Sequence, residues 1–408
     1  MVLKVLDLAV VNCRSCLLSV GKLRSLTYIK HGPCFESLPA CLTNLLSLQT
    51  IDLRHSGVQH LPENFYTLSK SLRHLYVGDK LIDLPPRFGE FLELQTLDVF
   101  IVGKNNELST LFRLAKLGGK LKIRYQIDRK KRVIPKIVQM LVALELDVLS
   151  LMWSSSNSEP FGSIDPKKEV VETEFLQPPP TVKNLVVQGW NKLSFPEWTM
   201  NQFPSLLNNL ISLHITDCTS CQCLPSFSTI LNFEYLEIWG LDALEWIESC
   251  GNNVDVSSSV KAFFSSLKYL KVANLPRLKR WEESNVQDAP QKIFKFLSEI
   301  RISGRPNLMS IPSAPSLETL EASNIHAELL KQLLDGQKSV LSSTLKELHI
   351  NSVHELESLS INVFLTKLKT ENCEELDCKA LTDVDQEIIG TSGATWKGLE
   401  KFYLLKLT

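Results

Sequence analysis

The sequence predicts an α/β repeat solenoid, and two observations carry that prediction. A short apolar frame, L-x-x-L-x-L, recurs along the whole chain, and the segments between its copies share a Leu-Pro pattern of their own. Because residues two apart in a strand point to the same face, each frame predicts a short strand with one apolar face. A single unit cannot cover that face, so the units must stack into one parallel sheet.

The frame has about sixteen copies, and the first five start 20 to 25 residues apart. Later copies lie up to 36 residues apart. This spacing is typical of a leucine-rich-repeat horseshoe with a parallel concave β-sheet and short irregular or helical convex segments. We expect one solenoid over residues 1–408, regular over 1–100 and less regular over 101–408. The copies start at Leu3, Leu23, Leu48, Leu72, Leu94, Leu121, Leu146, Val182, Leu210, Phe233, Leu267, Leu297, Leu317, Leu345, Leu365 and Leu399.

Three connections, LPACLTNLLSL from Leu38, LPENFYTLSKSL from Leu61 and LPPRFGEFLEL from Leu84, follow one pattern. The proline fixes the chain as it leaves the strand, and the later apolar residues predict a short helical or irregular segment packed on the sheet. Trp246 and Trp281 occupy matching places after their strands, and we expect core packing there rather than ligand binding. Stretches rich in Ser, Asp, Glu and Pro predict surface loops at 154–180, 251–262 and 282–291.

Three cysteines, Cys218, Cys221 and Cys223, lie within six residues and resemble half of a zinc site. Cys218 follows Ile215 by three residues, however, which is the Asn/Cys position of the repeat, where a buried side chain meets the turning backbone. Cys373 holds the same place after LTKLKT. We therefore expect buried thiols without metal.

Other motifs give no catalytic or metal-binding constellation. Zinc would need a second ligand pair, and Cys13 and Cys16 are many repeats away. The RKKR run at 129–132 is either a nuclear-import or phosphate-binding patch or, more simply, a solvated turn. Gly390 lacks the glycine spacing of a nucleophile elbow, and His354 has no second histidine four residues on. We expect no enzyme activity and no cofactor.

Charge and composition limit the partners and the cellular location that we expect for the chain. The chain has 44 Lys and Arg against 45 Asp and Glu, so no global field favours nucleic acid or an anionic membrane. Lys4 and Asp7 interrupt the apolar start, which argues against a signal peptide, and no apolar run is long enough for a membrane span. The scattered cysteines and the lack of N-x-S/T sites favour a reducing, cytoplasmic location.

These features together resemble the leucine-rich-repeat domain of plant coiled-coil nucleotide-binding leucine-rich-repeat (NLR) disease resistance proteins. The three Leu-Pro turns are of that family's kind, and the stretch FIVGKNNELSTLFRLAKLGGKLKI from Phe100 is similar to one of its blocks. A second similar block is FLQPPPTVKNLVVQGWNKLSFPEW from Phe175, and the PxLxxW motif spans Pro276 to Trp281. The resemblance covers nearly the whole chain.

The resemblance implies a coiled coil and a nucleotide switch before the repeats, and this sequence departs from it there. It has no GxxxxGK[S/T], because Gly119 and Lys120 are followed by Leu121 and lack the upstream glycine. The chain also begins inside a repeat, so we expect a fragment or a shortened gene product, to which ATP binding and signalling are not carried over.

The resemblance also implies a protein-recognition domain that senses a pathogen effector or a guarded host protein and restrains the nucleotide-binding domain of a full receptor. A generic cytosolic scaffold, or the substrate-recognition arm of a ubiquitin ligase, remains the alternative. We expect no nucleic-acid partner.

The repeat frame also identifies the residues that point out of the concave sheet, because they alternate with the inward leucines. Exposed Tyr, Trp and Arg often dominate binding energy, although scattered surface aromatics are common. The predicted partner-binding patch is Tyr235, Glu237, Trp239, Tyr269, Lys271, Glu299 and Arg301. Nearer the start of the chain, the residues expected to point outward are Thr50, Asp52, Arg54, His74, Tyr76, Thr96, Asp98 and Phe100.

Overall fold

The computed structural model of the chain contains two compact units, residues 1–187 and 188–408. The structure describes residues 3–10, 19–33, 36–103, 105–125, 141, 144–153, 177–190, 192–195, 207–225, 230–248, 264–282, 293–304, 307–308, 311–335, 344–353, 358–360, 367–371, 377–379 and 387–390.

The first unit begins with a parallel sheet in which neighbouring strands come from successive repeats. Its strands, in both chain and sheet order, are β1 (Val5–Asp7), β2 (Tyr28–Lys30), β3 (Thr50–Asp52), β4 (His74–Tyr76) and β5 (Thr96–Leu97). The central residues Ile29, Ile51, Leu75 and Leu97 lie opposite one another and are fully buried. The predicted inward row of apolar residues is therefore confirmed.

The Leu-Pro connections form short 3-10 helices behind this sheet: η1 (Ala40–Asn44), η2 (Glu63–Lys70) and η3 (Phe88–Glu90), followed later by η4 (Leu108–Arg113). The first two begin directly after Pro39 and Pro62, whose fixed φ prepares the turn. The buried rings of Phe65 in η2 and Phe91, directly after η3, contact each other in a tilted arrangement with centroids 5.6 Å apart.

The ladder is interrupted after β5, and this overturns one prediction. Strand β6 (Val99–Val102) begins after Asp98, which belongs to neither strand, and its first three residues, Val99, Phe100 and Ile101, are all buried. Phe100 pairs with buried Ile123 and contacts Phe88, with ring centroids 6.3 Å apart. It is fully buried rather than exposed, because the extra residue at the break inverts the pattern of alternating faces.

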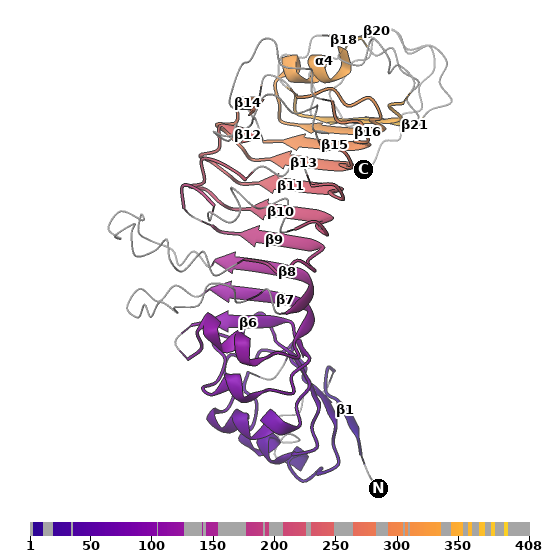
Figure 1. Ribbon diagram of the computed structural model, residues 1–408. Helices are drawn as coiled ribbons and strands as arrows, with labels where there is room; N and C mark the ends of the chain where they lie inside the picture. Colours follow the sequence, from indigo (N-terminus) through magenta and orange to yellow (C-terminus); the bar gives the residue numbers. More distant parts are fainter. Residues whose placement is uncertain are drawn as a thin grey trace. The chain divides into compact units, whose positions relative to one another are not determined.

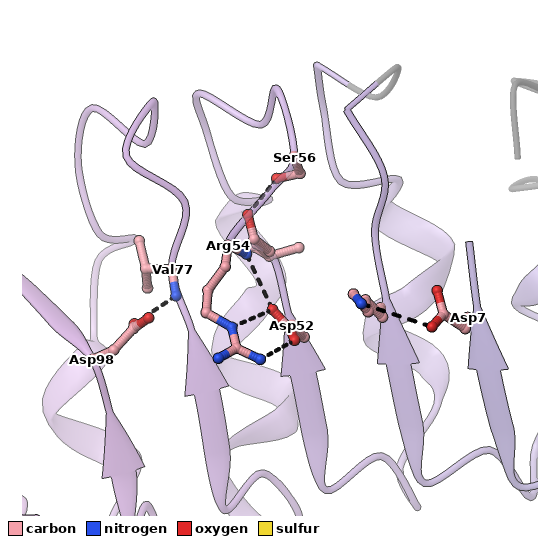
Figure 2. Close-up of polar contacts among 8 residues, drawn as sticks. Asp7, Asp52, Arg54, Ser56, Val77 and Asp98 are labelled. Carbon is pink, nitrogen blue, oxygen red and sulfur yellow. Dashed lines mark hydrogen bonds and ion pairs between the residues drawn. The ribbon is translucent and has the colours of Figure 1, made fainter. Parts of the chain in front are cut away.

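The side chain of Asp98 bridges this interruption (Figure 2). Earlier corners of the unit donate a backbone N–H to the next strand's carbonyl, as Leu53 does to Tyr76 at 2.8 Å. At the corner after β4, the N–H of Val77 instead donates to the Asp98 carboxylate at 2.6 Å. The expected outward residue thus replaces a missing ladder bond. The first unit then continues through β7 (Gly118–Tyr125), β8 (Glu145–Trp153) and β9 (Asn184–Gln188), and the last residue of β9 belongs to the second unit.

The main strands of the second unit are paired in parallel, and they lie side by side in Figure 1. In sheet order they are β10 (Ser212–Thr216), β11 (Tyr235–Trp239), β13 (Tyr269–Ala273), β15 (Glu299–Ser303), β16 (Thr319–Ser323), β17 (Glu347–Asn351), β19 (Lys367–Glu371) and β21 (Glu387–Gly390). In the strands from β10 to β17 the second and fourth residues are buried. The predicted repeat solenoid is confirmed by this parallel pairing.

Each strand of the main ladder from β9 to β17 is followed by a corner residue with positive φ. From the corners up to Asn324, the N–H donates to a carbonyl of the next repeat, as Asn274 does to Ser303 at 3.1 Å. Glycine and a short polar residue alternate along most of this line, which runs Gly189, Asp217, Gly240, Asn274, Gly304, Asn324 and Ser352. Asx residues and glycine are the types that tolerate this conformation best.

Several elements lie between the copies of the repeat frame or outside them. Two small parallel sheets, β12 (Trp246–Glu248) with β14 (Arg280–Glu282) and β18 (Ser358–Ser360) with β20 (Asp377–Lys379), accompany the second ladder. The α-helix α4 (Ala327–Asp335) fills one connection, which fits the predicted short helical segments. Strand β21 carries no L-x-x-L-x-L frame, and the copy at Leu399 lies outside the described residues.

Candidate functional site

The register of three strands brings the predicted patch residues together. Tyr235 on β11 lies opposite Tyr269 on β13, which lies opposite Glu299 on β15. Two residues further along, Glu237, Lys271 and Arg301 form a second line across the same strands. Residues separated by about 30 positions in sequence are thus direct neighbours on one sheet face.

Aromatic side chains form one side of this patch. Tyr235 is 44% exposed and Trp239 is 37% exposed, which is unusual for such large side chains. The rings of Tyr235 and Tyr269 are 5.7 Å apart between centroids and inclined by 36°, within the range of favourable aromatic pairs. Because neighbouring side chains support them, these rings can pack on a partner without losing much conformational freedom.

Glu237 lies between two partners on the adjoining strands. Its Oε1 is 2.6 Å from Nζ of Lys271, and its Oε2 is 2.9 Å from Nδ1 of His214 on β10. Burial alone would raise the pKa of Glu237, but hydrogen bonds from Lys271 and His214 hold that pKa below its ordinary value. The carboxylate is therefore charged at neutral pH.

Arg301 is held in place in a comparable way. Its Nε donates to Glu299 at 2.6 Å, and its Nη1 lies 3.4 Å from a carboxylate oxygen of Glu321 on β16. The guanidinium carbon is 5.7 Å from the centroid of the Tyr269 ring, a cation–π distance. His214 and Glu321 belong to this network and were missed from the sequence, although each occupies the same outward position in its own frame.

On the first unit, the expected outward residues form a smaller polar cluster (Figure 2). The Asp52 carboxylate accepts hydrogen bonds from Arg54 Nε at 3.0 Å and Nη2 at 2.6 Å. The guanidinium carbon of Arg54 is 4.6 Å from the centroid of the Tyr76 ring. Burial raises the pKa of Asp52, but the Arg54 hydrogen bonds outweigh it and hold the pKa low. Asp52 is buried, which corrects its expected exposure, whereas the Arg54 side chain is 51% exposed.

The cysteines have the environment expected of structural thiols. Cys218 is fully buried, as predicted, and its Sγ donates to the Thr216 carbonyl at 3.3 Å. Burial raises the pKa of the Cys218 thiol to about 12 and also raises that of Cys221. Within the described ranges, no group of three or more His, Cys, Asp or Glu residues is placed to hold a metal ion. Cys373, like Cys13 and Cys16, lies outside those ranges.

The tryptophans after the strands differ from each other. Trp281 is buried against Phe264 and Phe294, with edge-to-face geometry in both contacts, which confirms its predicted core role. Trp246 on β12 is half-buried. Most of the three predicted loops, together with the RKKR run and His354, lies outside the described residues, whereas Gly390 ends strand β21.

Comparison with known proteins gives a matching family model, related disease resistance proteins and similar solved structures. A family model described as "Leucine-rich repeat region" matches residues 1–276. "Putative disease resistance protein RGA4" of Solanum bulbocastanum is 30% identical over 273 residues, which cover 62% of this chain and 26% of that protein. "Putative disease resistance protein RGA1" of the same species is 30% identical over 300 residues, covering 70% and 28%. The chain thus spans about a quarter of the length of these relatives.

Among solved structures, an internalin (inlF) from Listeria monocytogenes aligns over 87% of this chain and 83% of its own, at 14% identity and a TM-score of 0.39. Within the part of the chain that the structure describes, no helix is both long enough and apolar enough to cross a membrane.

Proposed function

The chain belongs to the leucine-rich repeat region family, and from that premise we propose that it is the protein-recognition domain of a plant intracellular immune receptor. It binds a pathogen effector or a guarded host protein in the cytoplasm, and it restrains the nucleotide-binding domain of the full receptor. The likeness to the disease resistance proteins of Solanum bulbocastanum supports this role. The domain itself carries out no catalysis in this proposal.

The observation that carries the proposal is the patch on β11, β13 and β15. Two large aromatic side chains are exposed there, beside charged groups that are already fixed by ion pairs. Interfaces gain most of their binding energy from a few aromatic and arginine side chains in ordered surroundings. A surface that is ordered before binding also loses less entropy when a partner arrives.

The alternative, a scaffold or a ubiquitin-ligase recognition arm, makes a different prediction about the gene. A segment encoding a nucleotide-binding domain upstream of Met1 supports the receptor, whereas a segment encoding an F-box-like domain supports the alternative. Sequencing the full-length transcript distinguishes the two.

The patch is tested in a reconstructed full receptor that carries Tyr235→Ala or Trp239→Ala. Truncation of a true anchor costs about 2 kcal/mol, roughly thirtyfold in affinity, and should strongly weaken recognition of the partner protein. The melting temperature should hardly change, because both side chains point away from the core. Leu231→Ala is the matched control, since Leu231 is an exposed apolar residue outside the patch, in the turn before β11. Normal recognition by both patch variants would refute this site.

A further inference from the structure

The third residues of neighbouring strands form a row across the patch, which we name the central row. From β10 to β17 it runs His214, Glu237, Lys271, Arg301, Glu321 and His349. The two cations are adjacent at its centre, because Lys271 lies directly opposite Arg301. The glutamates occupy the flanking strands.

Two like charges on opposing residues cost stability, because their strands are only about 4.8 Å apart. The flanking residues reduce that cost by holding each cation from its outer side. Lys271 is paired with Glu237 on the preceding strand at 2.6 Å, and Arg301 approaches Glu321 on the following strand at 3.4 Å. Both cations nevertheless remain accessible, with side chains 36% and 46% exposed.

The two cations also keep hydrogen-bonding capacity. An ammonium group has three N–H donors and a guanidinium has five. Among the described residues, Lys271 donates to Glu237 and Arg301 donates through Nε to Glu299. Further donors on both groups therefore remain for a ligand above the sheet, next to the exposed ring of Tyr235.

On this basis, and resting on the proposed function, we propose that Lys271 and Arg301 together bind a carboxylate of the protein partner. The carboxylate belongs to an Asp or Glu side chain, and separate apolar or aromatic residues of the partner pack on Tyr235 and on Trp239, which lie at the two ends of β11. A bound carboxylate makes charge-assisted hydrogen bonds to both cations through the N–H donors that Glu237, Glu299 and Glu321 leave unused. A basic group placed over Lys271 and Arg301 would instead be repelled by both cations.

The probe is a library of random short peptides displayed on phage, selected on the full chain. Selected peptides are then synthesised, and their Kd is measured against the unchanged chain and against Lys271→Met, Arg301→Met and Trp239→Ala. Methionine keeps most of the aliphatic stem and removes the charge. Lys279→Met is the matched control, since Lys279 makes a similar pair with Glu245 at 3.0 Å but is not in the central row.

We expect the selected peptides to carry Asp or Glu beside an aromatic or aliphatic residue. Lys271→Met and Arg301→Met should each weaken binding about tenfold or more, and Asp→Asn in the peptide should cause a similar loss. Binding should also weaken as the salt concentration rises, whereas Lys279→Met should leave it unchanged.

The outcomes separate this inference from the proposed function. Peptides that depend on Trp239 but carry Lys or Arg, or that bind both methionine variants normally, overturn the carboxylate site and leave the recognition patch standing. Peptides that are indifferent to Trp239→Ala, or a library that yields no binder, count against the patch and the carboxylate site together.

Discussion

Replacing Gly304 with alanine should destabilise the second unit strongly, because two separate constraints meet at this corner. The residue follows β15 with a φ of 85°, which is unfavourable for any residue with a Cβ. A Cβ there would also lie 2.3 Å from Oδ1 of Asn274 and 2.7 Å from its backbone nitrogen. That nitrogen donates to the Ser303 carbonyl, so it cannot move without weakening a ladder bond.

The expected magnitude follows from these two constraints. The left-handed conformation costs alanine about 1–2 kcal/mol, and overpacking against fixed atoms adds roughly 1–3 kcal/mol. The stiffer unfolded chain offsets about 0.4–1 kcal/mol of this cost. We therefore expect Gly304→Ala to lower the free energy of unfolding by about 2–4 kcal/mol.

Two other glycines with positive φ supply graded controls. A Cβ on Gly240 would lie 3.2 Å from Oδ1 of Asp217, a tight but adjustable contact, and a Cβ on Gly119 would meet nothing within 4 Å. Gly119→Ala should therefore cost only the conformational part, about 1 kcal/mol, with Gly240→Ala between the two.

Urea unfolding followed by circular dichroism measures all three variants, and the shift in midpoint at constant slope gives each change in stability. Adding Asn274→Gly to Gly304→Ala should recover part of the loss, since it removes the contact with Oδ1 but not the contact with the backbone. The reasoning fails if Gly304→Ala costs no more than Gly119→Ala, or if the second substitution recovers nothing.

Three further predictions concern buried polar groups. Burial lowers the pKa of His31 to about 4, so protonation of this histidine below pH 6.5 favours the unfolded chain. The folded chain should therefore lose about 3 kcal/mol of stability as the pH falls from 6.5 to 4. In urea titrations at several pH values, the stability of His31→Gln should depend less on pH. Because burial raises the pKa of Cys218 to about 12, this thiol should resist alkylation at pH 8 until the chain unfolds. Rapid labelling of the native protein, detected by mass spectrometry, would contradict its burial. Stoichiometric zinc that is lost on Cys218→Ser would contradict the expectation of a metal-free thiol. Asp98→Ala should lower the free energy of unfolding, measured with heat or urea, by about 1–3 kcal/mol, because the N–H of Val77 loses its acceptor. Asp98→Asn should cost less, because the amide oxygen can still accept this hydrogen bond. Equal losses in the two variants would exclude the role of Asp98 as acceptor for Val77.

The repeat frame predicted the fold and the neighbours within the patch because each copy marks one strand. Tyr235 and Tyr269 were expected side by side although they are 34 positions apart in the sequence, and the register places them there. Phe100 was misassigned because the break between β5 and β6 shifts the side-chain alternation within β6, where Phe100 pairs with the buried Ile123. No hydrophobic pattern marks such a break, so it could not be predicted from periodicity alone.

Other features depend on contacts that a repeat frame does not encode. The Arg54 guanidinium hydrogen-bonds to Asp52, which is buried, and it also lies over the ring of Tyr76 in the next repeat. The position of Arg54 therefore depends on a residue outside its own copy of the frame. The pairing of Glu237 with both His214 and Lys271 likewise needs three strands in register. Strand β21 has isoleucines where the frame expects leucine and follows no Leu-Pro signal, so only pairing with β19 identifies it.

The alternating corners of the second unit limit how this chain can change its number of repeats. The side chain of Asn274 occupies space that only a glycine at the next corner leaves open, and Asp217 stands in the same relation to Gly240. Between Gly189 and Asn324, loss or duplication of a single repeat would bring two short polar corners, or two glycines, next to each other, whereas beyond Asn324 a polar corner, Ser352, already follows directly. An insertion or deletion of two repeats keeps the alternation intact. Unequal recombination in this part of the gene should therefore be tolerated best when it adds or removes repeats in pairs.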